Sequence, residues 1–258
     1  MGDILDKIIE NKRHEVELVK KSTPIADLEK SPLFSRECLS LRGSLQSVDF
    51  GIIGEIKRKS PSAGEIDNKL TVKDKASAYF EAGIQGISCL TDFNFFGGSI
   101  EDLIELRSHS SLPLLRKEFI IDPFQIIEAK ASGADAILLI SEALTKQEID
   151  SFTNLAHDLG LEVLLELHDE ENLSKTFCDA DIIGVNNRNL KLQITDIQNS
   201  IRLFDRLPKD KLKITESGIK TAEEIAVLYE KGFRGALIGE SILKHQNPRN
   251  FIKSLMPK

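Results

Sequence analysis

The chain has little cysteine and no long apolar run, and both shortages limit what it can be. Its three cysteines, Cys38, Cys89 and Cys178, are odd in number and far apart, with no Cys-x-x-Cys pair and no His-Cys cluster at metal spacing. We therefore expect reduced structural thiols and no metal site. No segment approaches the roughly 20 apolar residues of a membrane span. The charged N-terminal segment also lacks the apolar run of a signal peptide, so we expect a cytoplasmic protein.

Basic residues are also fewer than acidic ones. The chain has 34 lysines and arginines and 41 acidic residues, which gives a net charge of −7. Nucleic acid and anionic membranes attract clustered positive charge, so neither is expected as a partner. A small anionic substrate would need cations placed locally. Because the chain is 41% hydrophobic and 29% charged, it has an ordinary globular composition. We expect one domain over residues 1–258, since α/β barrels of about this length routinely form one domain.

What the chain does contain is an alternation of short apolar runs with longer amphipathic stretches. Stretches 72–83 and 221–232 have the length of helices and end at glycine. This alternation is typical of βα units and a parallel sheet, and predicts a (β/α)8 TIM barrel over residues 48–258. An open doubly wound sheet is the alternative, but it favours a GxGxxG turn after the first strand, which is missing here. The eight runs begin at Gly51, Gly86, Leu112, Ala134, Leu161, Asp181, Lys211 and Gly235.

A helical extension, residues 1–47, precedes the predicted barrel. Apolar residues at helical spacing among charges predict an amphipathic helix from Ile4 to Lys21. A second short helix is expected from Pro24 to Leu33, whereas Arg36 to Ser47 shows no clear periodicity. The extension is a candidate lid or cap for the barrel.

Several predicted strands change from apolar to polar residues at the same end. In a barrel, alternate residues of a strand point inward, and catalytic groups lie at the C-terminal face. Any one of these charges can equally solvate a loop end or join a structural ion network, but as a set they indicate a site. The other strand ends show no comparable convergence. The inward-facing series are Ile53, Glu55 and Lys57; Leu115, Lys117 and Phe119; Leu164, Glu166 and His168; Asn186 and Arg188; and Ile214 and Glu216.

A second signal lies in the last two loops. Glu216, Ser217 and Gly218 follow the seventh strand, and residues 238–241, with Gly239 and Glu240, follow the eighth. Loops in these places, with a short helix N-terminus, form the common phosphate site of this fold, and glycine lets backbone N–H groups approach a phosphate. Plain turns are the alternative. Phe96, in a loop after the second strand, suits a wall for a flat ring.

The motifs resemble one family over essentially the whole chain, namely indole-3-glycerol phosphate synthase. IKRKSPS and LRKEFIID are specific to that family, whereas ESG and IGES are shared more widely. ILDKIIENKRHEV resembles the family's additional N-terminal helices. Gly54 departs from the family pattern, at a position expected to face the helices. The segments that carry the resemblance are GEIKRKSPSAGEI, ISCLTDFNFFGGS, LPLLRKEFIID, GADAILLI, LEVLLELHDEENL, IGVNNRNL, ITESGI and ALIGESIL.

The resemblance implies a substrate, 1-(2-carboxyphenylamino)-1-deoxyribulose 5-phosphate, and the products indole-3-glycerol phosphate, carbon dioxide and water, with no cofactor. Lys117 would be the general acid that protonates the ribulose carbonyl. Glu166 would act as general base or acid in the dehydration. Glu55 and Asn186 would orient and stabilise intermediates. The remaining catalytic assignment is Lys57, which would hold the substrate's anionic groups.

The resemblance also implies the substrate-binding residues. Ser60 would assist at the carboxylate of the substrate, and Phe96 and Phe119 would flank the anthranilate ring. Glu216 belongs to the same set. The phosphate would be surrounded by Arg188, Ser217, Gly218, Gly239 and Glu240, the last two acting through backbone N–H groups while the carboxylate of Glu240 points away.

Two rival functions remain at this point. Another phosphosugar barrel, such as an isomerase of the preceding pathway step, would share the phosphate loops but should lack Glu55, Lys57, Lys117 and Glu166. A barrel that only binds a phosphorylated ligand is the other, but intact acid–base groups argue against it. We expect a monomer whose partner is the small phosphosugar-anthranilate substrate.

Overall fold

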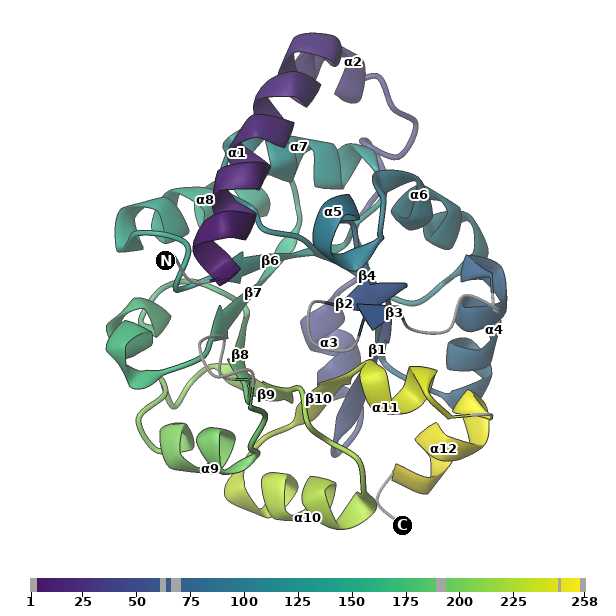
Figure 1. The fold of residues 1–258 in the computed structure, drawn as a ribbon, viewed down its shortest axis with the longest axis vertical. Helices are drawn as coiled ribbons and strands as arrows, with labels where there is room; N and C mark the ends of the chain where they lie inside the picture. Colours follow the sequence, from purple (N-terminus) through teal and green to yellow (C-terminus); the bar gives the residue numbers. More distant parts are fainter. Residues whose placement is uncertain (1–3, 61–63, 66–70, 189–193, 246, 256–258) are drawn as a thin grey trace.

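The computed structural model describes residues 4–60, 64–65, 71–188, 194–245 and 247–255. Within these residues, eight parallel strands form a closed barrel, viewed end-on in Figure 1. Each strand pairs with the next along the chain, and the last pairs with the first. The predicted (β/α)8 barrel is confirmed. The strands are β1 (Gly51–Ile56), β4 (Gly86–Leu90), β5 (Leu114–Lys117), β6 (Ala136–Ile140), β7 (Glu162–Leu167), β8 (Ile182–Asn186), β9 (Leu212–Glu216) and β10 (Gly235–Ile238).

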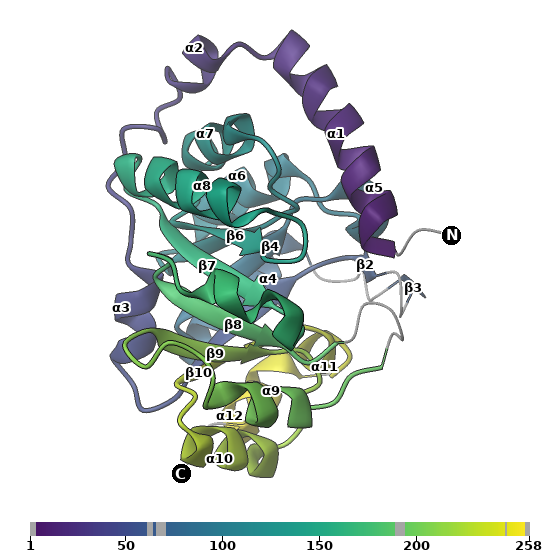
Figure 2. The ribbon, with the colours of Figure 1, turned by 90° about the vertical axis from the view of Figure 1, so that its left-hand side faces the viewer.

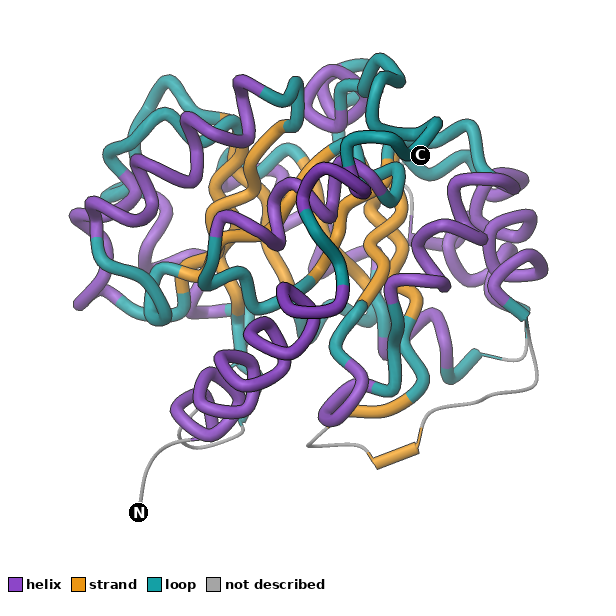
Figure 3. The backbone as a smooth tube through the Cα atoms, turned by 90° about the horizontal axis from the view of Figure 1, so that it is seen from above, coloured by secondary structure: helices purple, strands orange, loops and turns teal. Residues whose placement is uncertain are grey.

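Helices surround the strands, as Figure 3 shows from another side. Capping boxes begin several of them, at Thr71, Ser99, Asp122, Thr145 and Thr221, because each cap side chain accepts a backbone N–H that the first turn leaves unpaired. The elements between the barrel strands and after the last are β2 (Lys59–Ser60), β3 (Gly64–Glu65), α4 (Val72–Ala82), α5 (Phe93–Phe96), α6 (Ile100–His109), α7 (Pro123–Ala131), α8 (Lys146–Asp158), the 3₁₀ helix η1 (Glu170–Thr176), α9 (Gln198–Phe204), α10 (Ala222–Lys231), α11 (Glu240–Leu243) and α12 (Pro248–Leu255).

The hydrophobic core has two layers, because alternate residues of each strand face opposite sides. Ile53, Leu115 and Leu164 pack inside the barrel, whereas neighbours such as Ile52 pack between the strands and the helices. The predicted inward series is therefore confirmed for the apolar residues. Gly54 faces the helix layer, as expected, since a Cβ there would lie 2.8 Å from both Ile84 and Tyr79.

The N-terminal extension agrees only partly with the sequence expectation. Helix α1 (Ile4–Ser22) is confirmed, but α2 (Ile25–Leu28) ends before the predicted Leu33. Helix α3 (Leu41–Gln46) was missed. It is too short for a periodic signal and owes its stability to packing, since Leu41 and Leu45 are fully buried in the interior cluster. Figure 2 shows α3 and α1 at opposite ends of the barrel.

The end of the barrel that carries α3 contains an ion network, so the expectation of no polar convergence there is wrong. Asp135 is fully buried and lies 2.6 Å from Nη2 of Arg36 and 2.9 Å from Nη1 of Arg107. Its carboxylate also accepts the backbone N–H groups of Leu39 and Leu114. The strand pattern could not reveal this network, because both cations come from outside the strands.

None of the helices in the described part of the chain has the length and apolar character needed to cross a membrane.

We expect Asp135→Ala to lower the free energy of unfolding by about 3–5 kcal/mol, because it leaves Arg36 and Arg107 without their buried partner. Urea denaturation followed by circular dichroism measures this change. Asp205→Ala is the matched control, since Asp205 is exposed and pairs with Lys231 at the surface, where an ion pair contributes about 0–1 kcal/mol. Equal changes in the two variants would contradict a structural role for the Asp135 network.

Candidate active site

A pocket opens at the C-terminal ends of the barrel strands, where α1, α5 and α11 also lie. It brings together the predicted site residues from seven of the strands and their following loops. Ser60 ends β2, and its side chain lies outside the described part of the structure. The predicted residues that line the pocket are Glu55, Lys57, Phe96, Lys117, Phe119, Glu166, Asn186, Arg188, Glu216, Ser217, Gly218, Gly239 and Glu240.

Lys117 lies at the centre of the charged groups. Its Nζ is 2.7 Å from Oε2 of Glu166 and 2.5 Å from Oε2 of Glu216. Burial alone would lower the pKa of Lys117, but the nearby carboxylates of Glu166, Glu216 and Glu55 outweigh burial and raise this pKa well above its usual range. Lys117 is therefore a proton-bearing cation at neutral pH.

The four central charges form one layer of the barrel. Glu55, Lys117, Glu166 and Glu216 come from β1, β5, β7 and β9, and each follows by two residues an inward apolar residue. Barrel interiors are built from layers of four side chains supplied by alternate strands. Here the uppermost layer is ionic and the layer below it is apolar, which explains how a buried lysine meets acidic residues far apart in sequence.

Glu166 and Glu216 share Lys117, yet they differ electrostatically. Burial raises the pKa of both carboxyls. Lys117 and His168 outweigh burial at Glu166 and lower its pKa, whereas burial and the charge of Glu166 outweigh Lys117 and raise the pKa of Glu216. Within the described residues, Oε1 of Glu216 is buried without a hydrogen-bond partner. The surroundings therefore favour the ionised form of Glu166 more strongly than that of Glu216.

Glycine makes room for two of these carboxylates. A Cβ at Gly239 would lie 2.1 Å from Oε1 of Glu55, and one at Gly184 would lie 2.3 Å from Oε1 of Glu216. Glu55 is buried and accepts a hydrogen bond from Nζ of Lys57 at 2.5 Å. Gly184, which we did not single out in the sequence, is therefore required for the site although it has no side chain to contribute.

An apolar wall lies beside the charges. The rings of Phe96 and Phe119 are in contact, with centroids 5.9 Å apart and a tilt of 34°. A flat ring held between them would need about 7 Å, so the two rings lie side by side along one wall instead of on either side of a gap. Ile4, Leu5 and Ile8 of α1 also line the pocket.

The opposite part of the pocket contains the predicted anion-binding groups. Ser217 and Gly218 have φ values of 67° and 83°, and Ser217 is held in this left-handed conformation although it is not glycine. Its carbonyl accepts a hydrogen bond from the Asn187 side chain at 3.0 Å. A strained turn of this kind is typical of functional sites.

We expected the side chain of Glu240 to point away from these groups, but it points toward them. Its carboxylate lies 3.3 Å from Nη2 of Arg188 and 2.6 Å from Nζ of Lys244. The two cations hold the carboxylate, and Lys244 lies one helical turn further along the chain, where such pairs form readily.

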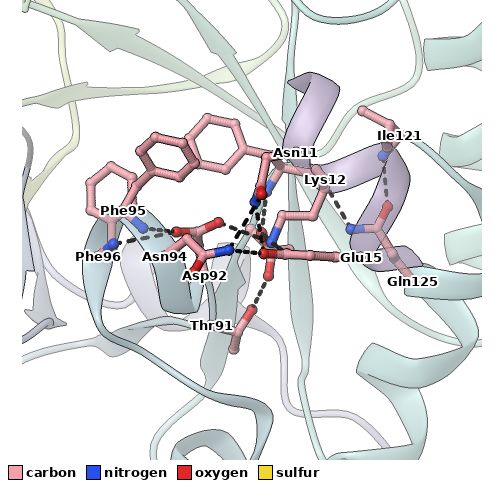
Figure 4. Close-up of polar contacts among 12 residues, drawn as sticks. Asn11, Lys12, Glu15, Thr91, Asp92, Asn94, Phe95, Phe96, Ile121 and Gln125 are labelled. Carbon is pink, nitrogen blue, oxygen red and sulfur yellow. Dashed lines mark hydrogen bonds and ion pairs between the residues drawn. The ribbon is translucent and has the colours of Figure 1, made fainter. Parts of the chain in front are cut away.

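Lys12 was missed by the sequence analysis, and it ties α1 to the pocket (Figure 4). Its buried Nζ lies 2.7 Å from Glu15, 2.9 Å from Asp92 and 3.1 Å from Glu118. Glu118 follows Lys117 directly, and Asp92 caps α5, which carries Phe96. One lysine thus connects the N-terminal helix to the segments that carry the ammonium group and the aromatic wall.

The signal for Lys12 was present in the sequence. On a helix, residue 12 shares a face with residues 8, 9 and 16, and Ile8, Ile9 and Val16 are all buried. A lysine on the apolar face of an amphipathic helix needs a buried partner. What the sequence did not supply was the identity of that partner.

No group of three or more histidine, cysteine or acidic side chains suited to holding a metal ion occurs among the described residues.

We expect Lys12→Met to leave Asp92 and Glu118 buried without their shared cation, lowering the free energy of unfolding by about 3–5 kcal/mol. Because α1 would detach more readily, limited trypsin digestion should cut this helix faster than in the parent chain. Lys20→Met is the control on the same helix, since Lys20 is partly exposed and pairs with Asp122. A digestion rate unchanged in Lys12→Met would rule out the anchoring role.

Comparison with known proteins identifies the family. A family model described as indole-3-glycerol phosphate synthase matches residues 5–255. The chain is 43% identical to the indole-3-glycerol phosphate synthase of Bacteroides thetaiotaomicron, over 99% of this chain and 100% of the relative. It is 42% identical to that of Bacillus cereus, over 98% of each chain. A Pyrococcus furiosus tryptophan synthase complex structure matches with a TM-score of 0.59 and 18% identity, covering 80% of this chain and 97% of the other, which shows the fold alone. This chain belongs to the indole-3-glycerol phosphate synthase family.

Proposed function

We propose that the pocket carries out its family's reaction with Lys117 as the general acid. In that reaction, 1-(2-carboxyphenylamino)-1-deoxyribulose 5-phosphate closes to indole-3-glycerol phosphate and releases carbon dioxide and water. The observation that carries the proposal is the buried ammonium of Lys117, held 2.7 Å from Glu166 and 2.5 Å from Glu216. It lies between an aromatic wall and a set of anion-binding groups.

The two ends of the pocket fit the two ends of this substrate. Phe96 and Phe119 offer a flat apolar surface to the anthranilate ring. Arg188 also lines the pocket, and the backbone N–H groups of 217–218 and 239–240 supply further donors to the phosphate. The phosphate competes with Glu240 for Arg188. Lys57 binds the carboxylate of the substrate, and Ser60 assists it.

The first step joins the ring carbon to the sugar. Lys117 donates a proton to the ribulose carbonyl oxygen, which makes the carbonyl carbon electrophilic. The aromatic carbon that bears the carboxylate attacks it and forms the new C–C bond. Carbon dioxide then leaves, and the electrons of the broken bond restore the aromatic ring. Glu55 and Asn186 orient the intermediate, and Glu216 holds Lys117 in place.

The second step removes water. The hydroxyl formed in the first step leaves as water, and the neighbouring carbon loses a proton to complete the indole double bond. Lys117 first regains a proton from solvent and donates it to the leaving hydroxyl. Glu166, which is held in its ionised form and contacts Lys117, accepts the proton from carbon. Opposite protonation states on adjacent groups suit a step that needs an acid and a base together.

A phosphosugar isomerase is the remaining rival, and the ionic layer argues against it. An isomerase has no carboxylate to expel, whereas this pocket contains Lys57 and Glu55 in addition to the central acid–base groups. We also propose that the protein acts as a monomer in the cytoplasm. The three cysteines are free thiols, as a reducing compartment would keep them.

We expect Lys117→Ala to lower kcat by about 10²–10⁴-fold with little change in KM, because it removes the acid but few substrate contacts. Indole fluorescence during incubation with the substrate measures turnover. Lys213→Ala is the control, since Lys213 is a buried lysine of β9 outside the pocket. No product from folded parent protein would refute the family reaction, and near-normal turnover in Lys117→Ala would remove the general acid alone.

We expect Arg188→Ala to raise KM about 10–100-fold, the equivalent of one charge-assisted hydrogen bond, while kcat changes less. Arg202→Ala provides the comparison, because Arg202 is exposed on α9 and pairs with Glu170. Steady-state kinetics over a range of substrate concentrations separates the two constants. An unchanged KM in Arg188→Ala would place the phosphate elsewhere in the pocket.

A further inference from the structure

A second cation reaches the central carboxylates, and the catalytic scheme above does not use it. His168 follows β7 and is nine-tenths buried. Its Nε2 lies 3.2 Å from Oε1 of Glu166, and its Nδ1 lies 3.0 Å from Oε2 of Glu142. Glu142 follows β6. The ring therefore links a carboxylate of the pocket to a carboxylate behind it.

Both ring nitrogens face carboxylate oxygens, which constrains the charge of the ring. An ionised carboxylate only accepts hydrogen bonds, and a neutral imidazole has one N–H and one lone pair. Either neutral tautomer would point a lone pair at a carboxylate oxygen. The arrangement suits the doubly protonated imidazolium form.

Glu142 is held in place for this contact. Its Oε1 accepts the backbone N–H of His168 at 2.9 Å, and the Ser141 hydroxyl lies 3.0 Å from its Oε2. Because both oxygens are engaged, the carboxylate cannot turn away from the ring without losing hydrogen bonds inside the protein. On the other side of His168, Asn199 donates to the backbone carbonyl at 2.8 Å.

We infer that His168, kept as an imidazolium by Glu142, is a positioning residue that holds Glu166, rather than Glu216, in its ionised form. Glu166 has two cations at ion-pair distance, Lys117 and His168. Among the described residues, Glu216 has Lys117 alone at that distance. The carboxylate with two cations is held in its ionised form more strongly than the carboxylate with one. This inference rests on the proposed role of Glu166 as proton acceptor.

The charges around His168 favour its protonated form. Burial by itself lowers the pKa of His168, but Glu166 on its own strand, Glu142 after β6 and Glu216 on β9 together raise it above its ordinary value of 6.5. Lys117 on β5 is the other cation in contact with Glu166, and it also pairs with Glu216. Loss of the imidazolium charge would raise the pKa of Glu166. As the pH falls, Glu166 would then become protonated, and the base would be lost, at a higher pH.

Two substitutions remove this charge in different ways. Glu142→Gln keeps an acceptor for the His168 backbone N–H but presents an amide donor to Nδ1, so the ring stays in place and loses its proton at a lower pH. His168→Gln removes the ring and leaves an uncharged donor near Glu166. His157→Gln is the matched control, because His157 also pairs with a carboxylate, Asp181, at 2.9 Å on the outside of the barrel.

The test combines ring nitrogen NMR with the pH dependence of kcat. In the parent protein, the ¹⁵N shifts of His168, assigned by their loss in His168→Gln, should report a doubly protonated ring to above pH 6.5. Glu142→Gln should deprotonate at lower pH. In His168→Gln the acid limb of kcat should move to higher pH by about one to two units, whereas Glu142→Gln, whose ring is protonated again in acid, and His157→Gln should match the parent there.

Two results would overturn the inference. One is a His168 ring that is neutral below pH 6.5 in the parent protein. The other is a uniform fall in kcat at every pH with an unmoved acid limb, which is the signature of a purely structural role. If His168→Gln does not fold, the ¹⁵N shifts of Glu142→Gln still test the charge of the ring. Absence of product from the parent protein would refute the family reaction instead, and the NMR result stands independently of it.

Discussion

The buried ammonium of Lys117 is the interaction on which the rest of the site depends. A charge taken out of water costs several kcal/mol unless it is closely paired, and Glu166 and Glu216 provide that pairing at 2.7 and 2.5 Å. Two acids around one lysine would leave an excess of negative charge. The contact of Glu166 with the ring of His168 offsets this excess. The charge balance that stabilises this layer therefore also holds the proposed acid, Lys117, beside the proposed base, Glu166.

The two ends of the barrel use buried charge for different purposes. Around Asp135, the arginines and backbone N–H groups satisfy one carboxylate completely, so this network only holds α6 and the extension to the barrel. At the other end, Oε1 of Glu216 is left without a partner among the described residues, and Ser217 is held at a positive φ. At the pocket end, an unpartnered carboxylate oxygen lies next to a residue held in a strained conformation, and this combination is typical of a reactive site.

Helix α1 completes the pocket through its packing as well as its charge. Ile8 faces the pocket from the same helix face that carries Lys12, and Lys12 contacts the residue next to Lys117. Attachment of the helix and placement of the ammonium group therefore involve neighbouring atoms. This arrangement explains why the extension, which lies outside the repeating βα pattern, belongs to the site.

The sequence by itself determined the barrel and most of the site, because strand and helix periodicities and the switch from Ile53, Leu115 and Leu164 to the charged residues two positions later are local patterns. The tertiary structure decided which charges touch. The pairing of Lys12 with Glu118, of Asp135 with two arginines, and of His168 with Glu142 joins residues from separate elements. The tertiary structure also decided that the side chain of Glu240 turns toward Arg188 and that α3 forms. These outcomes depend on distances between segments, and spacing along a single chain does not contain those distances.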